Sequence, residues 1–389
     1  MNRIYLDNCA TTPLAAEVFE AMRPYMTQLF GNASSIHSFG REAKVALDAA
    51  RETVAHALNA LPQEITFTSG GTEANNAALF GLAQACSKPG HLITSRIEHP
   101  SVLQAVRELQ TRGWACTQVE PDETGMITVE AIAKAIRSDT ILISLMHANN
   151  EVGTINPIAE IAALAQEHGI LFHTDAVQTF GKLALDLRTV PVSLLSLSGH
   201  KIYGPKGAGA LFVRRGVKIS SLLHGGKQER ERRAGTENVA AIAGLGKAVA
   251  LRRQEHESEW QRLRMLSQNF IARVHELYPN VSFNGNENHR LPGVVNLSFP
   301  GRDSLAMVMS LDLQGVAVSN GSACSSGSVE PSHVLRAMNL SRERANSAIR
   351  FSMGKYTTEA EIETTLEALE KILVKRARRN LSHEELMSA

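Results

Sequence analysis

The middle of the chain alternates short apolar runs with longer amphipathic ones. Between about residues 63 and 215, seven short runs are apolar almost without interruption, which is typical of strands covered on both faces. These runs are ITFTS (65–69), HLITS (91–95), WACTQVE (114–120), ILISLMHA (141–148), LFHTDA (171–176), LLSLSG (194–199) and GALFVRR (209–215). Helical stretches lie between most of them, over 73–86, 101–112, 128–137 and 159–168. This order predicts an α/β fold with a mostly parallel seven-stranded sheet.

The segments on either side of this region predict further helices and a second, smaller α/β unit. Residues 41–60 form an amphipathic helix, and a long helix over about 239–275 leads out of the first unit. Three more strand-like runs follow, VVNLSF (294–299), GVAVS (315–319) and AIRFSMG (348–354). Thr358 and Glu361 have the spacing of a capping box at the start of a C-terminal helix.

The length of 389 residues is enough for two domains. We expect a large domain over 13–255 and a small domain made of 1–12 and 256–389. The small domain would carry a loop of small residues at about 319–330, which contains Cys324.

Charge and cysteine content limit the function classes. Forty Lys and Arg against 39 Asp and Glu give a net charge of +1, which predicts neither nucleic-acid nor membrane binding. The longest apolar stretch, 239–251, contains Lys247 and is too short to span a membrane. The four cysteines are too far apart for CxxC-type metal or redox motifs. The N-terminus has no secretory signal, so a cytoplasmic protein without a metal site is expected.

Polar residues at the carboxyl ends of the predicted strands are the first candidates for chemistry, because ligands bind there in open α/β sheets. SGGTEANN (69–76) follows the first strand, and its Gly71 and Thr72 could grip a phosphate at a helix start, although an ordinary turn fits equally well. Asp175 ends another apolar strand, where it either caps the next helix or pairs with a cationic ring nitrogen.

A lysine and a cysteine stand out in the same way. Lys201 follows the 194–199 strand in SGHKIYGPKG, and a lysine desolvated there would make a Schiff base, whereas Lys206 is further from the strand. Cys324 lies among Gly and Ser in SNGSACSSGS and has little to pack against, so a reactive thiol is favoured over inert packing. The other three cysteines, Cys9, Cys86 and Cys116, are interpreted as packing residues.

Taken together, these motifs resemble those of one enzyme family. The ordered set is GGTE, EHPS, NNEVG, HTDAVQ, SGHKIYGPKG, RRAGTEN, GSACSSG and IRFSMG. It is similar to the cysteine desulfurases of the NifS/IscS type, which are pyridoxal-phosphate (PLP) enzymes of the aspartate-aminotransferase fold. The resemblance runs from 6–13 to 357–362, nearly the whole chain.

The resemblance implies a role for each cofactor residue. Lys201 would hold PLP and later move the substrate Cα proton, while Asp175 would keep the pyridine nitrogen protonated. Gln178 would donate to the ring hydroxyl oxygen. The phosphate would be bound by the turn at Gly71 and by Thr72, Ser198, His200 and, from a second subunit, Thr236.

The resemblance also implies the substrate residues and the reaction. His99 would stack on the cofactor ring and shuttle protons. Asn150 would bind the cofactor and would also join Arg350 in holding the substrate carboxylate. Cys324 would attack the substrate sulfur, so that L-cysteine becomes L-alanine and the enzyme carries a persulfide. The implied partners are a second copy of the chain and a sulfur-acceptor protein such as an iron–sulfur scaffold.

Other functions remain possible at this point. A selenocysteine lyase or another PLP aminotransferase of the same fold would use the same lysine and aspartate. A non-enzymatic sulfur carrier would need only the Cys324 loop. A nicotinamide dehydrogenase is disfavoured because no GxGxxG opens the first βα unit.

Overall fold

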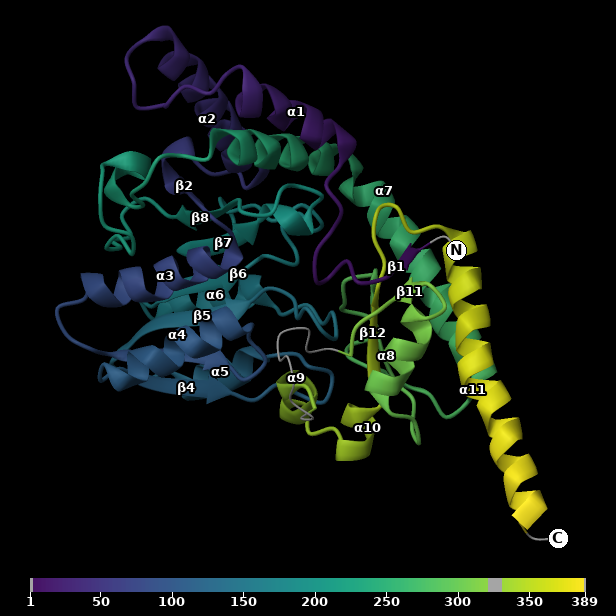
Figure 1. The fold of residues 1–389 in the computed structure, drawn as a ribbon. Coiled ribbons are helices and arrows are strands. Elements are labelled where there is room, and N and C mark those ends of the chain that lie inside the picture. Colours follow the sequence, from purple (N-terminus) through teal and green to yellow (C-terminus); the bar gives the residue numbers. More distant parts are fainter. Residues whose placement is uncertain (1–2, 321–330, 388–389) are drawn as a thin grey trace.

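A seven-stranded sheet forms the centre of the larger part of the molecule (Figure 1). The computed structural model describes residues 3–320 and 331–387, with side chains up to residue 373. The strand order is β2-β8-β7-β6-β5-β3-β4. The strands are β2 (Ile65–Thr68), β3 (His91–Ser95), β4 (Ala115–Val119), β5 (Thr140–Met146), β6 (Leu171–Asp175), β7 (Leu194–Ser198) and β8 (Gly209–Val213). All seven predicted strands are therefore present, and only β8 runs antiparallel to its neighbours.

Both faces of this sheet are covered, as the continuous apolar runs predict. Leu92 and Leu142 pack under the helices α3 (Gly71–Ala85) and α4 (Pro100–Thr111). Their neighbours Ile93 and Ile143 pack on the opposite face, which belongs to a different core cluster. Successive strand residues point to opposite faces, so a strand buried on both sides needs apolar residues at consecutive positions.

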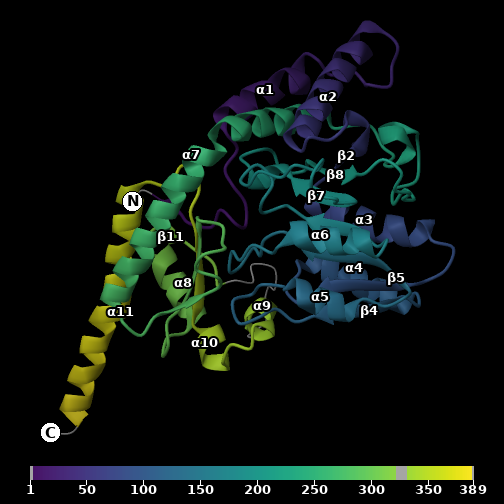
Figure 2. The ribbon, with the colours of Figure 1, turned by 180° about the vertical axis from the view of Figure 1, so that it is seen from behind.

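The apolar residues of the opposite face pack against most of the remaining helices. These helices are α1 (Ala16–Thr27), α2 (Ser38–Ala57), α5 (Val129–Ala135), α6 (Ile158–Glu167) and the first half of α7 (Val239–Leu277). Among these, α1, α2 and α7 lie at the β2 end of the sheet (Figure 2). Short 3-10 helices are also present: η1 (Pro62–Glu64) directly before β2, η2 (Gly199–Lys201) directly after β7, and η3 (Gln228–Glu231) between β8 and α7.

A smaller unit has its own sheet and its own core. Strand β10 (Val294–Ser298) lies between β9 (Ser282–Asn284) and β12 (Ala348–Ser352), antiparallel to both. Its apolar core includes Phe270 of α7 and Phe351 of β12, whose ring centroids are 4.9 Å apart. The other helices of this part are α8 (Ser304–Asp312), α9 (His333–Ala337), α10 (Arg342–Asn346) and α11 (Glu359–Met387).

The third strand predicted for this unit is placed differently. The run 315–319 forms only the short strand β11 (Val316–Ala317), which pairs in parallel with β1 (Ile4–Tyr5) rather than joining β10 and β12. A two-residue strand gives no periodic signal of its own, so this pairing depends on the tertiary contact between the chain start and residue 316.

Helix α7 connects the two parts. Its first half contributes Ile242 and Leu245 to the core of the large sheet, and its second half contributes Phe270 and Val274 to the core of the smaller unit. The expected domain boundary at residue 255 falls inside this continuous helix and stays a prediction. The predicted capping box is present at α11, because Thr358 N donates to Glu361 Oε2 at 2.8 Å and Glu361 N donates to Thr358 Oγ1 at 3.2 Å. Among residues 3–320 and 331–387, no helix is long and apolar enough to cross a membrane.

Candidate active site

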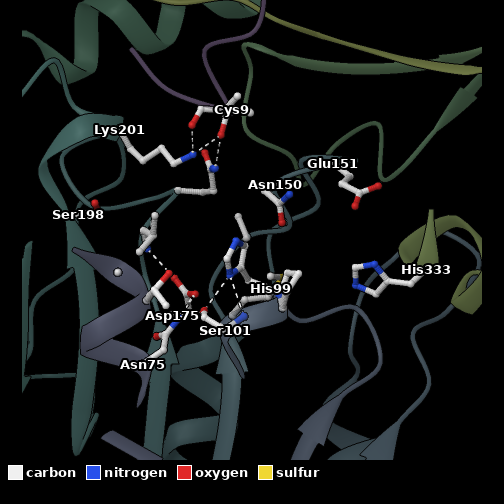
Figure 3. Close-up of a pocket in the computed structure, with 18 of the residues that line it drawn as sticks. Cys9, Asn75, His99, Ser101, Asn150, Glu151, Asp175, Ser198, Lys201 and His333 are labelled. Atoms are coloured by element: carbon white, nitrogen blue, oxygen red, sulfur yellow. Dashed lines mark hydrogen bonds between the residues drawn. The ribbon is translucent and has the colours of Figure 1, made fainter. Parts of the chain in front are cut away.

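A cavity of about 750 Å³ lies at the carboxyl ends of the central strands, between the large sheet and the smaller unit (Figure 3). A volume of this size suits a cofactor or substrate of modest size. Its lining includes ten residues that the sequence analysis singled out, namely Gly71, Thr72, His99, Asn150, Asp175, Gln178, Ser198, His200, Lys201 and Arg350.

Lys201 is buried at the end of the 3-10 turn η2, directly after β7. Its Nζ donates to Ala10 O at 2.7 Å and also to Cys9 O. Burial lowers the pKa of Lys201 to about 8, and the nearby cations Lys182 and Arg350 act in the same direction. An amine with this pKa is partly unprotonated near neutral pH, which a nucleophilic lysine requires. The competing Lys206 is exposed and does not line the cavity.

Asp175 presents its carboxylate at the end of β6 and is held from two sides. Val177 N donates to Oδ1 at 2.9 Å, and Asn75 Nδ2 donates to Oδ2 at 2.7 Å. Asn75 also donates to Ser101 Oγ at 2.9 Å, so the amide fixes the carboxylate relative to helix α4. A carboxylate held in this way is suited to a cationic ring nitrogen.

His99 lies at the start of α4, on the other side of the cavity from Lys201 (Figure 3). Its Nδ1 accepts from Ser101 N at 3.1 Å and lies 2.8 Å from Ser101 Oγ. Burial lowers the pKa of His99, although the Asp175 carboxylate partly opposes this. The lowered pKa favours the neutral ring, and because Nδ1 accepts from Ser101 N, the neutral ring carries its proton on Nε2.

One end of the cavity has the features of an anion site. Gly70 adopts φ +152°, and a Cβ on Gly71 would lie 2.6 Å from Val177 Cγ2, so this turn requires glycine. The Ser198 hydroxyl is buried beside the turn and has no hydrogen-bond partner among the described residues. Burial, with Lys201 and Lys206 nearby, lowers the pKa of His200 to about 4, so its imidazole is neutral. The start of α3, together with Ser198, offers donors to a phosphate.

The opposite end contains Arg350, which is only 2% exposed. Its Nη2 lies 2.6 Å from Asp7 Oδ1, and its Nη1 donates to Asn150 O at 2.9 Å. Its Nε is buried without a partner in the described part of the chain. Arg350 lines the cavity, and its contacts with Asp7 and Asn150 use only two of the five guanidinium N–H groups, so donors remain for a carboxylate.

Some expectations are not met within one chain, and some residues were not anticipated. Thr236 does not line the cavity, and Cys324 lies outside the described residues. Gln178 Nε2, expected to donate to the cofactor, donates here to Cys9 O at 3.0 Å, while its Oε1 has no partner among the described residues.

The cavity is also lined by residues to which the sequence analysis gave no role in the site: Cys9, Ala10, Asn75, Ser101, Glu151, Ser332, His333 and Arg336. Asn75 lies in SGGTEANN and Ser101 lies in EHPS, so membership in these motifs is the sequence feature that could have identified both residues.

The other cysteines occupy packed positions. Cys9 is buried with Ala148 and Leu291, and Cys86 and Cys116 pack beside the α3–α4 core. Burial raises the pKa of the Cys86 thiol and raises that of Cys116 to about 12. These two thiols are therefore poor nucleophiles at neutral pH.

The residues of the cavity fit pyridoxal phosphate on structural grounds. The unpartnered Ser198 hydroxyl and the Gly70–Gly71 turn suit the phosphate, and the fixed Asp175 carboxylate suits the pyridine nitrogen. Lys201 supplies an amine at the same cavity. These groups therefore match the phosphate, the ring nitrogen and the Schiff-base carbon of the cofactor.

Comparisons with known proteins agree with this geometry. Residues 4–365 match the model of the aminotransferase class-V family. The chain is 50% identical to the cysteine desulfurase IscS of Dictyoglomus turgidum over 373 residues, which is 96% of this chain and 95% of that protein. It is 46% identical to a putative cysteine desulfurase, IscS 1, of Bacillus subtilis, over 94% of this chain and 97% of that protein.

Solved structures give the same result. A NifS-like protein has a TM-score of 0.90 at 36% identity, with 95% of this chain and 99% of that chain covered. A structure described as SspA in complex with cysteine has a TM-score of 0.80 at 39% identity and covers 91% of this chain and 100% of that chain. The expected aspartate-aminotransferase fold is confirmed. The chain belongs to the aminotransferase class-V family of pyridoxal-phosphate enzymes.

Proposed function

We propose that this protein is a PLP-dependent cysteine desulfurase that converts L-cysteine to L-alanine. The observation that carries the proposal is the convergence of Lys201, Asp175, His99 and Arg350 on one cavity. Relatives that are 46% and 50% identical over nearly the full length are named cysteine desulfurases, and a related structure is described as a complex with cysteine.

The cofactor residues have separate tasks in this proposal. When bound, PLP withdraws electrons from the substrate Cα. Asp175 stabilises a proton on the ring nitrogen, because its carboxylate is held in place by Val177 and Asn75. Lys201 holds the cofactor and then, as a free amine, accepts the Cα proton, for which a pKa of about 8 is well matched.

The substrate residues orient the amino acid. The Arg350 guanidinium binds the carboxylate through N–H groups that its contacts with Asp7 and Asn150 leave free. The Nδ1 of His99 accepts from Ser101 N, so the neutral ring carries its proton on Nε2 and can donate it beside the substrate and recover it afterwards.

The sulfur step is a transfer to Cys324. The Cys324 thiolate attacks the substrate sulfur, so that an S–S bond forms and the substrate C–S bond breaks. The carbon gains two electrons and a proton and becomes the methyl group of alanine, while both sulfur atoms are oxidised to the persulfide level. No other oxidant or reductant is needed.

The wider setting is also part of the proposal. A two-fold dimer would bring Thr236 to the phosphate of the neighbouring site, since it does not line the cavity of its own chain. The persulfide would pass to an acceptor such as an iron–sulfur scaffold protein, in the cytoplasm.

The test uses the holoenzyme with Cys324→Ser and, as a matched control, Cys86→Ser, which changes a packed cysteine away from the cavity. Cys324→Ser should keep the cofactor absorbance and its change on adding L-cysteine, because neither depends on the thiol. Alanine formation should be abolished, since a hydroxyl is a much weaker nucleophile than a thiolate. Cys86→Ser should retain both.

Peptide mass spectrometry locates the sulfur. Wild-type enzyme given L-cysteine without an acceptor should carry an extra sulfur on Cys324. Near-normal alanine formation by Cys324→Ser, or a persulfide on Cys9, Cys86 or Cys116, would contradict the assignment.

A further inference from the structure

The first residues of the chain cross from the smaller unit to the large sheet over the cavity. We call residues 6–12 the crossing segment; it leads from β1 towards α1 (Figure 1). At its first end, Asn8 N donates to Ser352 O at 3.1 Å and Cys9 N donates to Ser352 Oγ at 2.9 Å. The segment is thereby attached to strand β12, which also carries Arg350.

The second end is attached to the turn that carries Lys201. Thr12 N and Thr12 Oγ1 both donate to His200 O at 2.9 Å, and Tyr203 N donates to Thr12 Oγ1 at 2.8 Å. Between the two ends, the carbonyls of Cys9 and Ala10 accept from Lys201 Nζ. One short segment therefore contacts both the proposed cofactor lysine and the strand of the proposed substrate arginine.

Asp7 is the member of the crossing segment that reaches the guanidinium. Its Oδ1 is 2.6 Å from Arg350 Nη2, while Asn150 O accepts from Nη1, so two of the three nitrogens are fixed from different parts of the fold. The third, Nε, is buried and unpartnered among the described residues. A guanidinium has five N–H groups, and these two contacts leave enough of them for a carboxylate.

We infer that Asp7 is a positioning residue, which holds Arg350 in the orientation that binds the substrate carboxylate. The inference rests on the proposed role of Arg350 in substrate binding. An arginine side chain has many rotamers, and holding it in the binding orientation before the substrate arrives removes an entropy cost from binding. The alternative is that Asp7 competes with the substrate for the guanidinium, and the two alternatives predict opposite changes in affinity.

The experiment compares two amines that differ only in the carboxylate. L-alanine, the proposed product, and ethylamine are titrated into the holoenzyme, and binding is followed by cofactor absorbance. Asp7→Ala should weaken L-alanine binding and raise KM for L-cysteine about tenfold or more, since misplacing a binding group by about 1 Å is this costly. The kcat value and the dissociation constant of ethylamine should change less than about threefold, because the contact with the carboxylate is uniform in ground and transition states.

Two further variants keep the test decisive. Asp7→Asn retains an oxygen acceptor for Nη2 without the charge, so its KM for L-cysteine should lie between those of the wild type and Asp7→Ala. This variant also tests the inference if Asp7→Ala does not fold. Asp139→Asn is the matched control. It removes an exposed carboxylate that lies 2.9 Å from Arg137, away from the cavity, and should change the dissociation constant of neither L-alanine nor ethylamine.

The outcomes separate this inference from the proposed function. Tighter L-alanine binding by Asp7→Ala, or an equal loss for L-alanine and ethylamine, would overturn it. If Arg350→Ala raises KM and the Asp7 variants do not, the positioning role is wrong and the proposed function stands. If Arg350→Ala leaves KM unchanged, the carboxylate role of Arg350 is wrong, and the role of Asp7 is wrong with it.

Discussion

Burial controls the protonation of the titratable side chains around the cavity. It lowers the pKa of Lys201 to about 8 and that of His200 to about 4. The free amine of Lys201 is therefore present in a useful fraction near neutral pH, whereas a solvated lysine with a pKa of ~10.4 would be almost fully protonated. This effect comes from the position of the residue after a buried strand rather than from its immediate sequence neighbours.

The rate at which the cofactor-free protein captures PLP should follow the titration of Lys201. The neutral amine is the reactive form, so the rate should rise with pH and level off above a pH of about 8. Stopped-flow absorbance at a series of pH values measures this profile. Lys206→Ala should keep it and Lys201→Ala should lose covalent capture; an inflection close to pH ~10.4 would show that Lys201 is not desolvated as described.

A buried ion pair fixes the loop that carries Thr236. Arg51 of α2 contacts both carboxylate oxygens of Glu229, at 2.8 and 2.6 Å, and the two side chains are 4% and 2% exposed. Phe67 N also donates to Glu229 Oε2 at 2.9 Å, which connects the loop to β2. Glu229, Arg230 and Glu231 all have positive φ, between 46° and 64°, so the loop holds an unfavourable backbone conformation.

Removing one partner of this pair should be costly. Glu229→Ala leaves a buried guanidinium unpaired, and we expect the free energy of unfolding to fall by about 3–5 kcal/mol. The double variant Arg51→Met with Glu229→Gln should lose less than the sum of the losses of the single variants Arg51→Met and Glu229→Gln. Urea unfolding of the holoenzyme measures all of them.

The control cycle uses Lys44 and Asp48 on the same helix, which are 2.8 Å apart and about half exposed. Their coupling should be within measurement error, because exposed pairs contribute little. Additive effects at Arg51 and Glu229 would contradict the role assigned to the buried pair.

At the scale of the whole molecule, the site depends on parts that are far apart in the chain. The large sheet supplies Asp175 and Lys201, and the smaller unit supplies Arg350. Within one chain Thr236 stays outside the cavity. The proposed dimer, in which a second subunit would supply Thr236, leads to a direct test.

Mixed dimers of Lys201→Ala and Thr236→Ala subunits should regain activity. If Thr236 acts on the neighbouring site, each mixed dimer has one site with both residues intact, so we expect about half of the wild-type activity per dimer with wild-type cofactor affinity. Differently tagged subunits, co-expressed and purified by both tags, provide the sample. Mixed dimers that bind PLP only as weakly as Thr236→Ala would mean that Thr236 serves its own chain.

The sequence by itself determined the strands and the turns that follow them. All seven central strands lie where the sequence predicts them. Those inside the sheet are buried on both faces and need apolar residues at successive positions, whereas the edge strand β4 is only partly buried. The positions of Asp175 and Lys201 at the ends of such runs follow from the same pattern. The antiparallel direction of β8 could not be predicted, since an apolar run does not encode its direction.

Only the tertiary structure decided which distant groups meet. Asp7 and Arg350 are 343 positions apart, and the carbonyls of Cys9 and Ala10 reach Lys201 over more than 190 positions. Backbone carbonyls are common to all residues, so no residue type marks these two as contacts of a lysine. Contacts of this kind arise when the smaller unit packs against the large sheet, and local propensity and periodicity contain no information about that packing.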